Sequence, residues 1–205
     1  MVVVEGKRAR LSASDWTAAA LQALAEGGLA AVAVEPLATR LGATKGSFYW
    51  HFTGRDELIE SALAEWERRG TDDVIAASDA RPDVVTRLRE LLRLVLGAVE
   101  RDPSVGVELA LQATARHPLV APVLARVTER RLAYLTRLFT ELGFAPAEAS
   151  RRGLLAYTAY LGHAQLAHAT AELVPAGEAL SAYVEDVVQT LLADRRAPTG
   201  GAPGQ

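Results

Sequence analysis

The sequence predicts an all-α protein, and two features of it support this prediction. Half of its 205 residues are hydrophobic, with abundant Ala, Leu and Val, which favours helices. These residues recur every three or four positions between breaks that contain Gly or Pro. A chain of this length fits one or two small domains and can bury a substantial core.

Composition also limits the kinds of function. The chain has no cysteine, so it holds neither a disulfide framework nor a thiolate metal site. Residues 1–4 are apolar, but this run is too short to direct secretion or to span a membrane. We therefore expect a soluble cytoplasmic protein that does not contact a membrane.

Catalytic and metal-binding patterns are missing from the sequence. It has no Gly-rich phosphate loop, no nucleophile motif and no cluster of metal ligands. His163 and His168 lie five residues apart, about 140° around a helix, so they are poorly placed to share a metal. We expect neither an enzyme nor a cofactor, and we interpret these histidines as core or interface residues.

The first helices follow from their caps and breaks. Residues 12–15 have capping-box spacing and predict a helix over 12–26, which Gly27 and Gly28 end before a connector at 29–32. A second helix begins near Val34, where Ala33 is a poor N-cap and Pro36 falls harmlessly in the first turn. A fourth helix is expected from 55 or 56 to about 69, followed by a plausible break at 70–73.

The remaining helices are bounded mainly by prolines and glycines. Pro103 is expected to end a helix that starts at about Asp83, and Pro118 is expected to open a later one. The helices expected after the fourth cover about 83–101, 105–116, 118–142, 146–173 and 177–193. Residues 195–205 are rich in Pro and Gly and predict a disordered tail, and residues 1–11 predict a basic arm.

Residues 41–52 form the most informative stretch. Gly42 lies where a helix C-terminal glycine belongs, and Thr44 is placed to cap the next helix. Phe48 and Phe52 share one face of that helix and are expected to pack inward. Two helices joined by a short turn with Gly make a helix-turn-helix, whose second helix enters the major groove of DNA.

The ordered set of residues from Val34 to Leu58 resembles the TetR/AcrR family of bacterial transcription regulators. It includes Leu37-Ala38 in the first helix, the Gly42 turn, Lys45-Gly46, Tyr49-Trp50-His51-Phe52 and Arg55 ahead of Glu57-Leu58. The resemblance implies an N-terminal three-helix helix-turn-helix domain followed by a helical-bundle ligand-binding and dimerisation domain. The expected division is an arm and DNA-binding domain at 1–54, the second domain at 55–194 and the tail at 195–205.

DNA contacts are expected around the motif despite an acidic pI of about 5.8. Basic residues cluster there, and no acid lies between Pro36 and Gly54, although each cation alone could be an ordinary solvated residue. The backbone at the start of the second motif helix is expected to bind phosphate. The predicted DNA-binding residues are Arg10, Thr44, Lys45, Gly46, Ser47, Tyr49, Trp50, His51 and Arg55.

A ligand cavity is implied by the family resemblance, and polar or aromatic residues among the aliphatic helices are its candidates. Each one alone could equally be a core residue. The predicted ligand-binding residues are Trp66, Gln112, His117, Tyr134, Tyr157, Tyr160, His163 and Gln165.

The last two helices are the expected homodimer interface. The final helix repeats apolar residues at near-heptad spacing, including Val184, Val188 and Leu191. In the family, the last two helices of each subunit form a four-helix interface. Ordinary core packing is the alternative.

Two functions are consistent with the sequence. The first is a sequence-specific transcriptional regulator, a repressor that binds double-stranded operator DNA as a homodimer and is released by a small-molecule effector. The second is a helical enzyme or interaction module in which the N-terminal domain is only structural. A regulator without a ligand, or one that activates, is also left open by the sequence.

Overall fold

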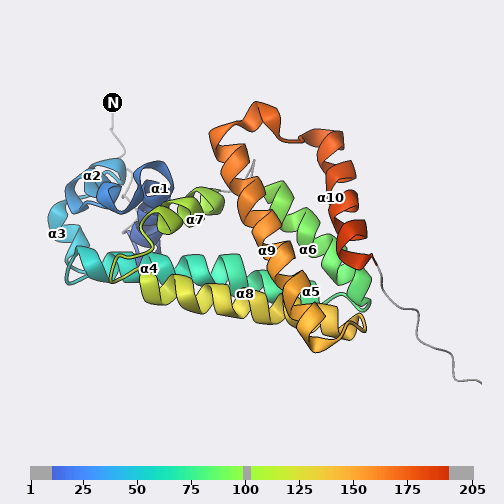
Figure 1. Ribbon diagram of the computed structural model, residues 1–205. Helices are drawn as coiled ribbons and strands as arrows, with labels where there is room; N and C mark the ends of the chain where they lie inside the picture. The colour runs from blue at the N-terminus through green and yellow to red at the C-terminus, as the bar shows by residue number, and fades with distance from the viewer. Residues whose placement is uncertain (1–10, 99–102, 194–205) are drawn as a thin grey trace, which may run out of the picture.

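The computed structural model describes residues 11–98 and 103–193, and all regular elements in these ranges are helices (Figure 1). In chain order they are α1 (Ala13–Ala31), α2 (Val34–Arg40), α3 (Lys45–Phe48), α4 (Arg55–Glu67), η1 (Arg68–Asp72), α5 (Asp73–Asp79), α6 (Val84–Ala98), α7 (Pro103–Ala113), α8 (Ala121–Glu141), α9 (Pro146–Ala169), η2 (Ala171–Leu173) and α10 (Gly177–Leu192). The all-α prediction is confirmed. The predicted tail and nearly all of the predicted arm, Arg10 included, lie outside the described residues.

Two hydrophobic cores divide the molecule. The first joins α1–α4, α7 and the start of α8 around the fully buried Trp16, Phe48 and Leu63. The second joins α6, the end of α8, α9 and α10 around residues such as Leu92 and Phe139. Figure 1 shows the first three helices at one end of the molecule and α6, α9 and α10 at the other.

The N-terminal helices begin where their caps predict. The Ser12 backbone N–H donates to Asp15 Oδ2 at 2.7 Å, which forms the predicted capping box. Gly27 and Gly28 break the helical conformation as expected, but 29–31 form a further helical turn instead of an extended connector. Ala33 precedes α2 in an extended conformation without a side-chain cap, and Gly42 turns the chain with a φ of 61°.

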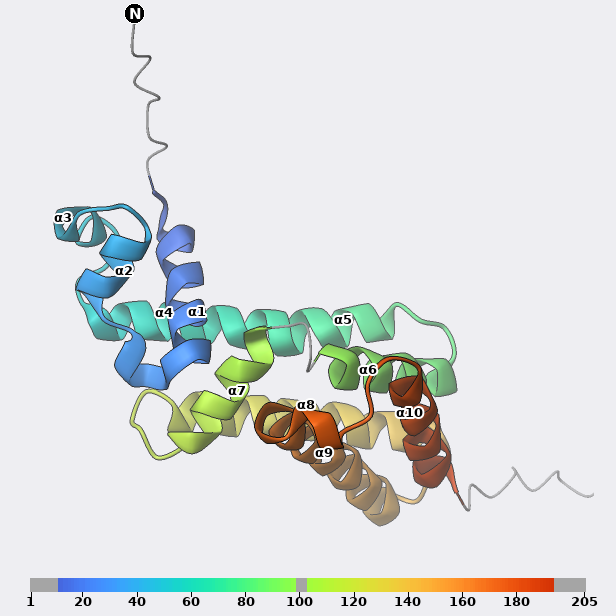
Figure 2. The same ribbon diagram turned by 90° about the horizontal axis from the view of Figure 1, so that it is seen from above.

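The predicted break at 70–73 is wrong. Residues 68–72 form a π-helical turn, closed by a bond from the Asp73 N–H to the Arg68 carbonyl, and helix continues on both sides. Residues 55–79 therefore make one continuous rod, called here the connecting helix, which Figure 2 shows running along the whole molecule. At 1.5 Å per residue it is roughly 35–40 Å long.

Two prolines differ from the expected helix boundaries. Pro103 is the first residue of α7, two residues before the predicted start at 105, because the first turn of a helix tolerates its missing N–H. The predicted end of the preceding helix at 101 lies outside the described residues. Conversely, Pro118 lies in a turn, and α8 begins three residues later with Pro122 in its first turn. The helix predicted over 146–173 ends at Ala169 and is followed by the short 3₁₀ helix η2.

The stripe of α10 that was predicted to form a dimer interface is part of the subunit core. Leu180, Val184, Val188 and Leu191 are buried, and α10 packs on α6. Exposed leucines lie instead on α9 and η2, at Leu154, Leu155, Leu166 and Leu173. The periodicity identified a buried face correctly, but a heptad pattern does not distinguish a neighbour in the same chain from one in a second chain.

Candidate nucleic-acid interface and internal cavities

The candidate nucleic-acid interface is built on the first turn of α3. Thr44 Oγ1 accepts a hydrogen bond from the Ser47 N–H at 3.2 Å, which confirms its predicted capping role. Below α3, the Phe48 ring packs edge-on against Trp16 at 5.3 Å and stacks on Phe52 at 5.5 Å. This aromatic support fixes α3, although the helix is only one turn long.

Two large aromatic side chains project from the end of α3 into solvent. Tyr49 is 55% exposed and Trp50 is 79% exposed, while the next residue, His51, is half-buried. Exposed aromatic groups next to a fixed helix N-terminus are groups that can contact a sugar-phosphate backbone or a base edge.

Gly46 has no structural reason to be glycine. It does not adopt a positive φ, and an added Cβ would make only an ordinary 3.7 Å contact with Thr44 Oγ1. Within a helix, glycine is less favourable than alanine. A glycine here is therefore best explained by something that approaches the backbone from outside the protein.

Lys45 is held by an acid on the same surface. Its Nζ lies 2.9 Å from Glu35 Oε1, and both side chains are largely exposed. Their hydrogen bond raises the pKa of Lys45 and lowers that of Glu35. The lysine is therefore charged, and a phosphate that binds it has to compete with Glu35.

Arg55 differs from the other predicted DNA-binding residues because its side chain turns inward. Its Nε donates to the Val32 carbonyl at 2.6 Å, and its Nη2 donates to the Leu29 carbonyl. These bonds satisfy carbonyl groups at the end of α1 and tie the connecting helix to it. The contacts explain Arg55 without DNA.

Two partly open cavities lie beside the π turn. A cavity of about 70 Å³ is lined by residues of α5, α6, α8 and α9, with aliphatic walls and the rings of Tyr134, Tyr157 and Tyr160. A larger one of about 470 Å³ lies between α1, α6 and α7 and includes Trp66 and Glu108. Gly70, Val74, Val95, Arg131 and Tyr160 line both cavities, so one wall separates them.

A buried ion pair forms the polar part of that wall. Arg131 Nη1 lies 2.8 Å from both carboxylate oxygens of Glu108, whose side chain is almost fully buried. The same guanidinium donates to Thr71 Oγ1 at 3.0 Å and to the Gly70 carbonyl at 3.1 Å, both within the π turn. The Arg131 guanidinium also lies over the Trp66 ring, 5.4 Å from its centroid.

Arginines of α8 form ion pairs with the second half of the connecting helix. Arg126 Nη2 contacts Glu67 at 2.5 Å, and Arg130 contacts Asp72 at 2.6 Å. At the far end, Arg137 binds both oxygens of Asp79 at 2.7 and 2.9 Å. The π turn with its Arg131 contacts therefore lies between two polar attachments to α8.

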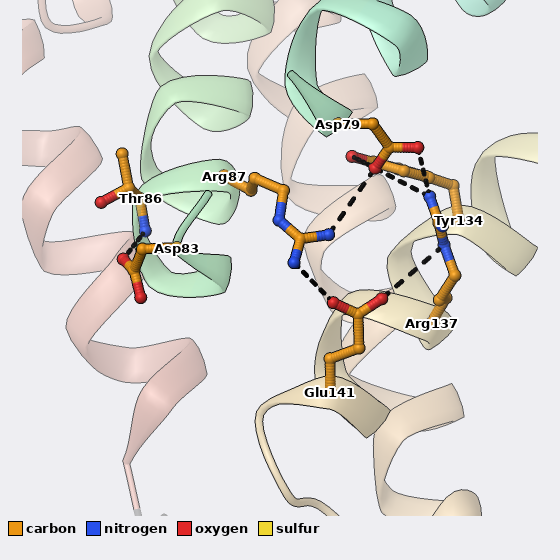
Figure 3. A network of polar contacts seen from close by, with 7 residues as sticks. All are labelled: Asp79, Asp83, Thr86, Arg87, Tyr134, Arg137 and Glu141. Atoms are coloured by element: carbon orange, nitrogen blue, oxygen red, sulfur yellow. Dashed lines mark hydrogen bonds and ion pairs between the residues drawn. The ribbon is translucent and has the colours of Figure 1, made fainter. Parts of the chain in front are cut away.

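Figure 3 shows the far attachment, where Asp79 of α5 meets α6 and α8. The Tyr134 hydroxyl donates to Asp79 at 3.1 Å, and Arg87 joins Asp79 to Glu141. The hydrogen bond from Arg137 holds the pKa of Asp79 below its usual value, while burial raises that of Tyr134. Tyr134 therefore gives the smaller cavity its ring, whereas its hydroxyl is already engaged.

Comparison with known proteins identifies the N-terminal region. Residues 17–62 match the family model described as bacterial regulatory proteins of the tetR family. This match spans the helix-turn-helix and the start of the connecting helix. The chain therefore carries the DNA-binding domain of the TetR family. It is a DNA-binding transcriptional regulator.

Solved structures share the fold of this TetR-family regulator over nearly its whole length. A transcriptional regulator from Rhodococcus sp. Rha1 is 23% identical, covers 92% of this chain and 100% of its own, and gives a TM-score of 0.75. The fatty acid degradation regulator FadR from Bacillus halodurans is 20% identical, with coverages of 96% and 100% and a TM-score of 0.68. FadR from Bacillus subtilis, solved in complex with stearoyl-CoA, is 14% identical, with coverages of 89% and 98% and a TM-score of 0.69. No curated protein matches the sequence.

The predicted ligand-binding residues of the regulator fall into two groups. Trp66, Tyr134, Tyr157 and Tyr160 line the two cavities. The other four lie elsewhere: Gln112 and Gln165 are exposed, His117 accepts the Leu119 N–H in a turn, and His163 stacks on Tyr183. Because the helical period alone does not show which helices face one another, the sequence could not separate these groups.

Sequence analysis missed the polar centre of the cavities, Arg131 and Glu108. Glu108 had a detectable signal, since it is an acid between Val107 and Leu109 in an otherwise apolar helix. Arg131 had none, because it follows Arg130 and looks like a second surface cation.

Two further properties concern the part of the chain that the structure describes. No group of three or more His, Asp or Glu side chains is placed there to hold a metal ion. None of the helices in the same ranges combines the length and apolar character that crossing a membrane requires.

Proposed function

We propose that this TetR-family regulator is a cytoplasmic homodimeric repressor that a small-molecule effector releases from its operator DNA. The observation that carries the proposal is the connecting helix. One end packs in the core of the helix-turn-helix, where Leu58 and Ile59 are fully buried. The other end supplies Thr71, Val74 and Ile75 to the cavity wall. A ligand in that cavity therefore touches the same helix that supports the recognition helix.

The proposed contact with DNA uses the exposed residues of α3. Lys45 and the backbone N–H groups at Thr44 and Gly46 are placed for phosphate, because the helix N-terminus favours anions. Ser47 and Tyr49 are the candidates for base edges, with Trp50 and His51 against the backbone. Arg55 is left out of this set because of its contacts with α1.

The proposed route of coupling is a movement of the connecting helix. Asp79 attaches the far end of the connecting helix to α6 and α8. Because that end is held, we expect a ligand to change the path of the connecting helix at the π turn. An effector releases DNA only if it binds better to the conformation in which the two recognition helices are misplaced. FadR from Bacillus subtilis, with its bound stearoyl-CoA, supports the view that this fold can hold a small molecule.

The proposed dimer interface is the exposed face of α9. Leu155, Gly162 and Leu166 lie on one stripe at helical spacing, and the two leucines are 52% and 55% exposed. A small residue between two leucines lets a second helix approach closely. Two-fold symmetry would then present two recognition helices to the half-sites of a palindrome.

The test is selection of duplex DNA from a random pool with the full chain, followed by titration of the selected duplex at several salt concentrations. We expect a palindromic site and an affinity that falls steeply with salt. A pool that shows no enrichment, with retention equal to that of bovine albumin, would contradict the proposal.

The dimer is tested by a matched pair of glutamates. Leu155→Glu should give a folded monomer with weak operator binding, because the two half-sites lose their linkage. Val188→Glu should instead destabilise the subunit, because its side chain is fully buried in the core. Sedimentation distinguishes a folded monomer from an unfolded or dimeric protein. If the Leu155→Glu variant sediments as a dimer, the interface is not on this face of α9.

A further inference from the structure

We propose that the two cavities bind an uncharged ligand with an apolar body and a carbonyl-type acceptor, and that they discriminate against carboxylates. This inference rests on the proposed effector site and names the chemical class of its ligand. Its physical basis is the balance of charge in the wall that both cavities share.

The charges of that wall are balanced inside the protein. Arg131 lines both cavities and Glu108 lines the larger one, and these two buried groups bind each other directly. Arg69 also lines the larger cavity, but it is 60% exposed and lies 2.5 Å from Glu65. A ligand therefore meets an interior with no net charge.

Each of the three guanidinium nitrogens of Arg131 already donates a hydrogen bond within the protein. Nε, Nη1 and Nη2 all donate to protein oxygens, at Thr71, Glu108 and Gly70. A ligand carboxylate that binds Nη1 has to displace Glu108, and one that binds the second N–H of Nη2 still lies on the same guanidinium as the Glu108 carboxylate. Burying an unpaired charge is costly, and two nearby carboxylates repel each other.

The tyrosines show where an uncharged acceptor would bind. The Tyr160 hydroxyl donates to Glu108 at 3.0 Å, whereas the Tyr157 hydroxyl reaches the same carboxylate at only 3.4 Å. A bond of that length is weak, so Tyr157 can turn to a ligand carbonyl at little cost. Burial and the Glu108 charge raise the pKa of both hydroxyls, so both remain donors at neutral pH.

The remaining walls suit an apolar body. The smaller cavity presents Val74, Ile75, Leu91 and Leu92, and the stacked rings of Tyr157 and Tyr160 form one side. Hydrophobic walls with a few placed polar groups are typical of small-molecule sites. In this site Thr71, Tyr157 and Tyr160 all bond to the Arg131–Glu108 pair, and polar groups gathered in this way favour an amphiphile over a ligand that is polar throughout.

The test uses octanamide and octanoate at neutral pH, a pair that is nearly equal in shape and differs in charge. Calorimetry on the full chain should show octanamide binding about tenfold more tightly than octanoate, the difference expected when a buried charge lacks a partner. Equal affinities, or tighter binding of octanoate, would overturn the proposal. Binding of neither probe would also overturn it.

Two variants assign the preference to the ion pair. Glu108→Gln leaves Arg131 without its partner charge, so octanoate should now bind more tightly than octanamide. The double variant Glu108→Gln/Arg131→Gln removes both charges and should restore the preference for octanamide. An unchanged preference in a folded Glu108→Gln variant would overturn the proposal, and if that variant does not fold, the wild-type comparison alone decides.

Retention on the selected duplex is measured on the same preparations. A protein that binds DNA with the expected salt dependence but prefers octanoate overturns only the ligand class. A protein that prefers octanamide but shows no specific DNA binding overturns the proposed function and leaves the ligand class standing.

Discussion

The two halves of the molecule build their polar sites in opposite ways. At the recognition helix, polar contacts are local and exposed, as in the bond from Ser47 to Thr44 and the Lys45–Glu35 pair. At the cavities, the contacts are buried and join residues about sixty positions apart, as between Arg131 and Gly70. The first arrangement presents groups to an external partner, whereas the second fixes how helices sit against one another.

The same residue type therefore has different consequences in the two regions. An ion pair exposed to water contributes little to stability, whereas breaking a buried one leaves an uncompensated charge. Substitutions near the recognition helix should therefore change DNA binding more than folding. Substitutions in the cavity wall should change folding and ligand response first.

The largest expected effect comes from removing Glu108. Glu108→Ala strands the Arg131 charge in the interior and should lower the free energy of unfolding by about 3–5 kcal/mol, measured by urea denaturation. Its matched control is Glu26→Ala, which breaks the exposed ion pair of Glu26 with Arg40 at 2.6 Å. The control should hardly change the free energy of unfolding. Equal losses of unfolding free energy in the two variants would contradict the contrast between the two regions.

The same glycine-to-alanine change should act differently in each half. Gly46→Ala should weaken DNA binding by about tenfold, or 1.4 kcal/mol, without loss of stability, because its Cβ has room in the protein. Gly70→Ala should leave DNA affinity nearly unchanged, but its Cβ would lie 3.3 Å from Arg131 Nη2 and should alter ligand binding. Titration of both variants with DNA and with octanamide tests this contrast between the two glycines. Weakened DNA binding by Gly70→Ala would contradict it.

A local cap should stabilise the N-terminal domain on its own. Ala33 has the extended conformation of an N-cap but no side-chain bond, so Ala33→Ser should raise the free energy of unfolding by about 0.5–2 kcal/mol. Thermal melting measures the gain. A melting temperature that does not rise would show that the first turn of α2 is already satisfied.

The smallest expected effects on DNA binding come from substitutions of surface charges. Lys45→Ala should weaken binding to all sequences and lower the salt slope by about one unit. Glu35→Gln should free Lys45 and raise DNA affinity by about two- to fivefold, the range of exposed charge pairs. Glu178→Gln on α10 makes the same change in net charge and is the control. An equal effect of both glutamine variants would mean that only net charge matters.

The success of prediction from the sequence also differs between local and long-range contacts. The capping box at Ser12, the Thr44 cap and the buried Phe48 were predicted correctly, because each can be recognised from residues within four positions. The inward turn of Arg55 was not predicted, since it depends on carbonyl groups more than twenty residues away. Residues whose structural role is set by neighbours in the chain are therefore the ones that the sequence identifies.

The connecting helix shows the limit most clearly. Gly70 and the polar residues after it are poor helix formers, which is why a break was predicted there. The helix continues because Arg131 binds the turn from α8, and only the folded structure brings these residues together. Likewise, Val188 has the same pattern whether it packs in its own subunit or against a second one.

Reciprocal titration tests the proposed coupling of the cavity to the recognition helix through the connecting helix. Octanamide is titrated into the protein alone and into the protein saturated with the selected duplex. A coupling of about 1–3 kcal/mol should weaken octanamide binding about 5–150-fold on DNA, and saturating octanamide should weaken DNA binding by the same factor. Equal octanamide affinity in the two titrations would contradict this coupling.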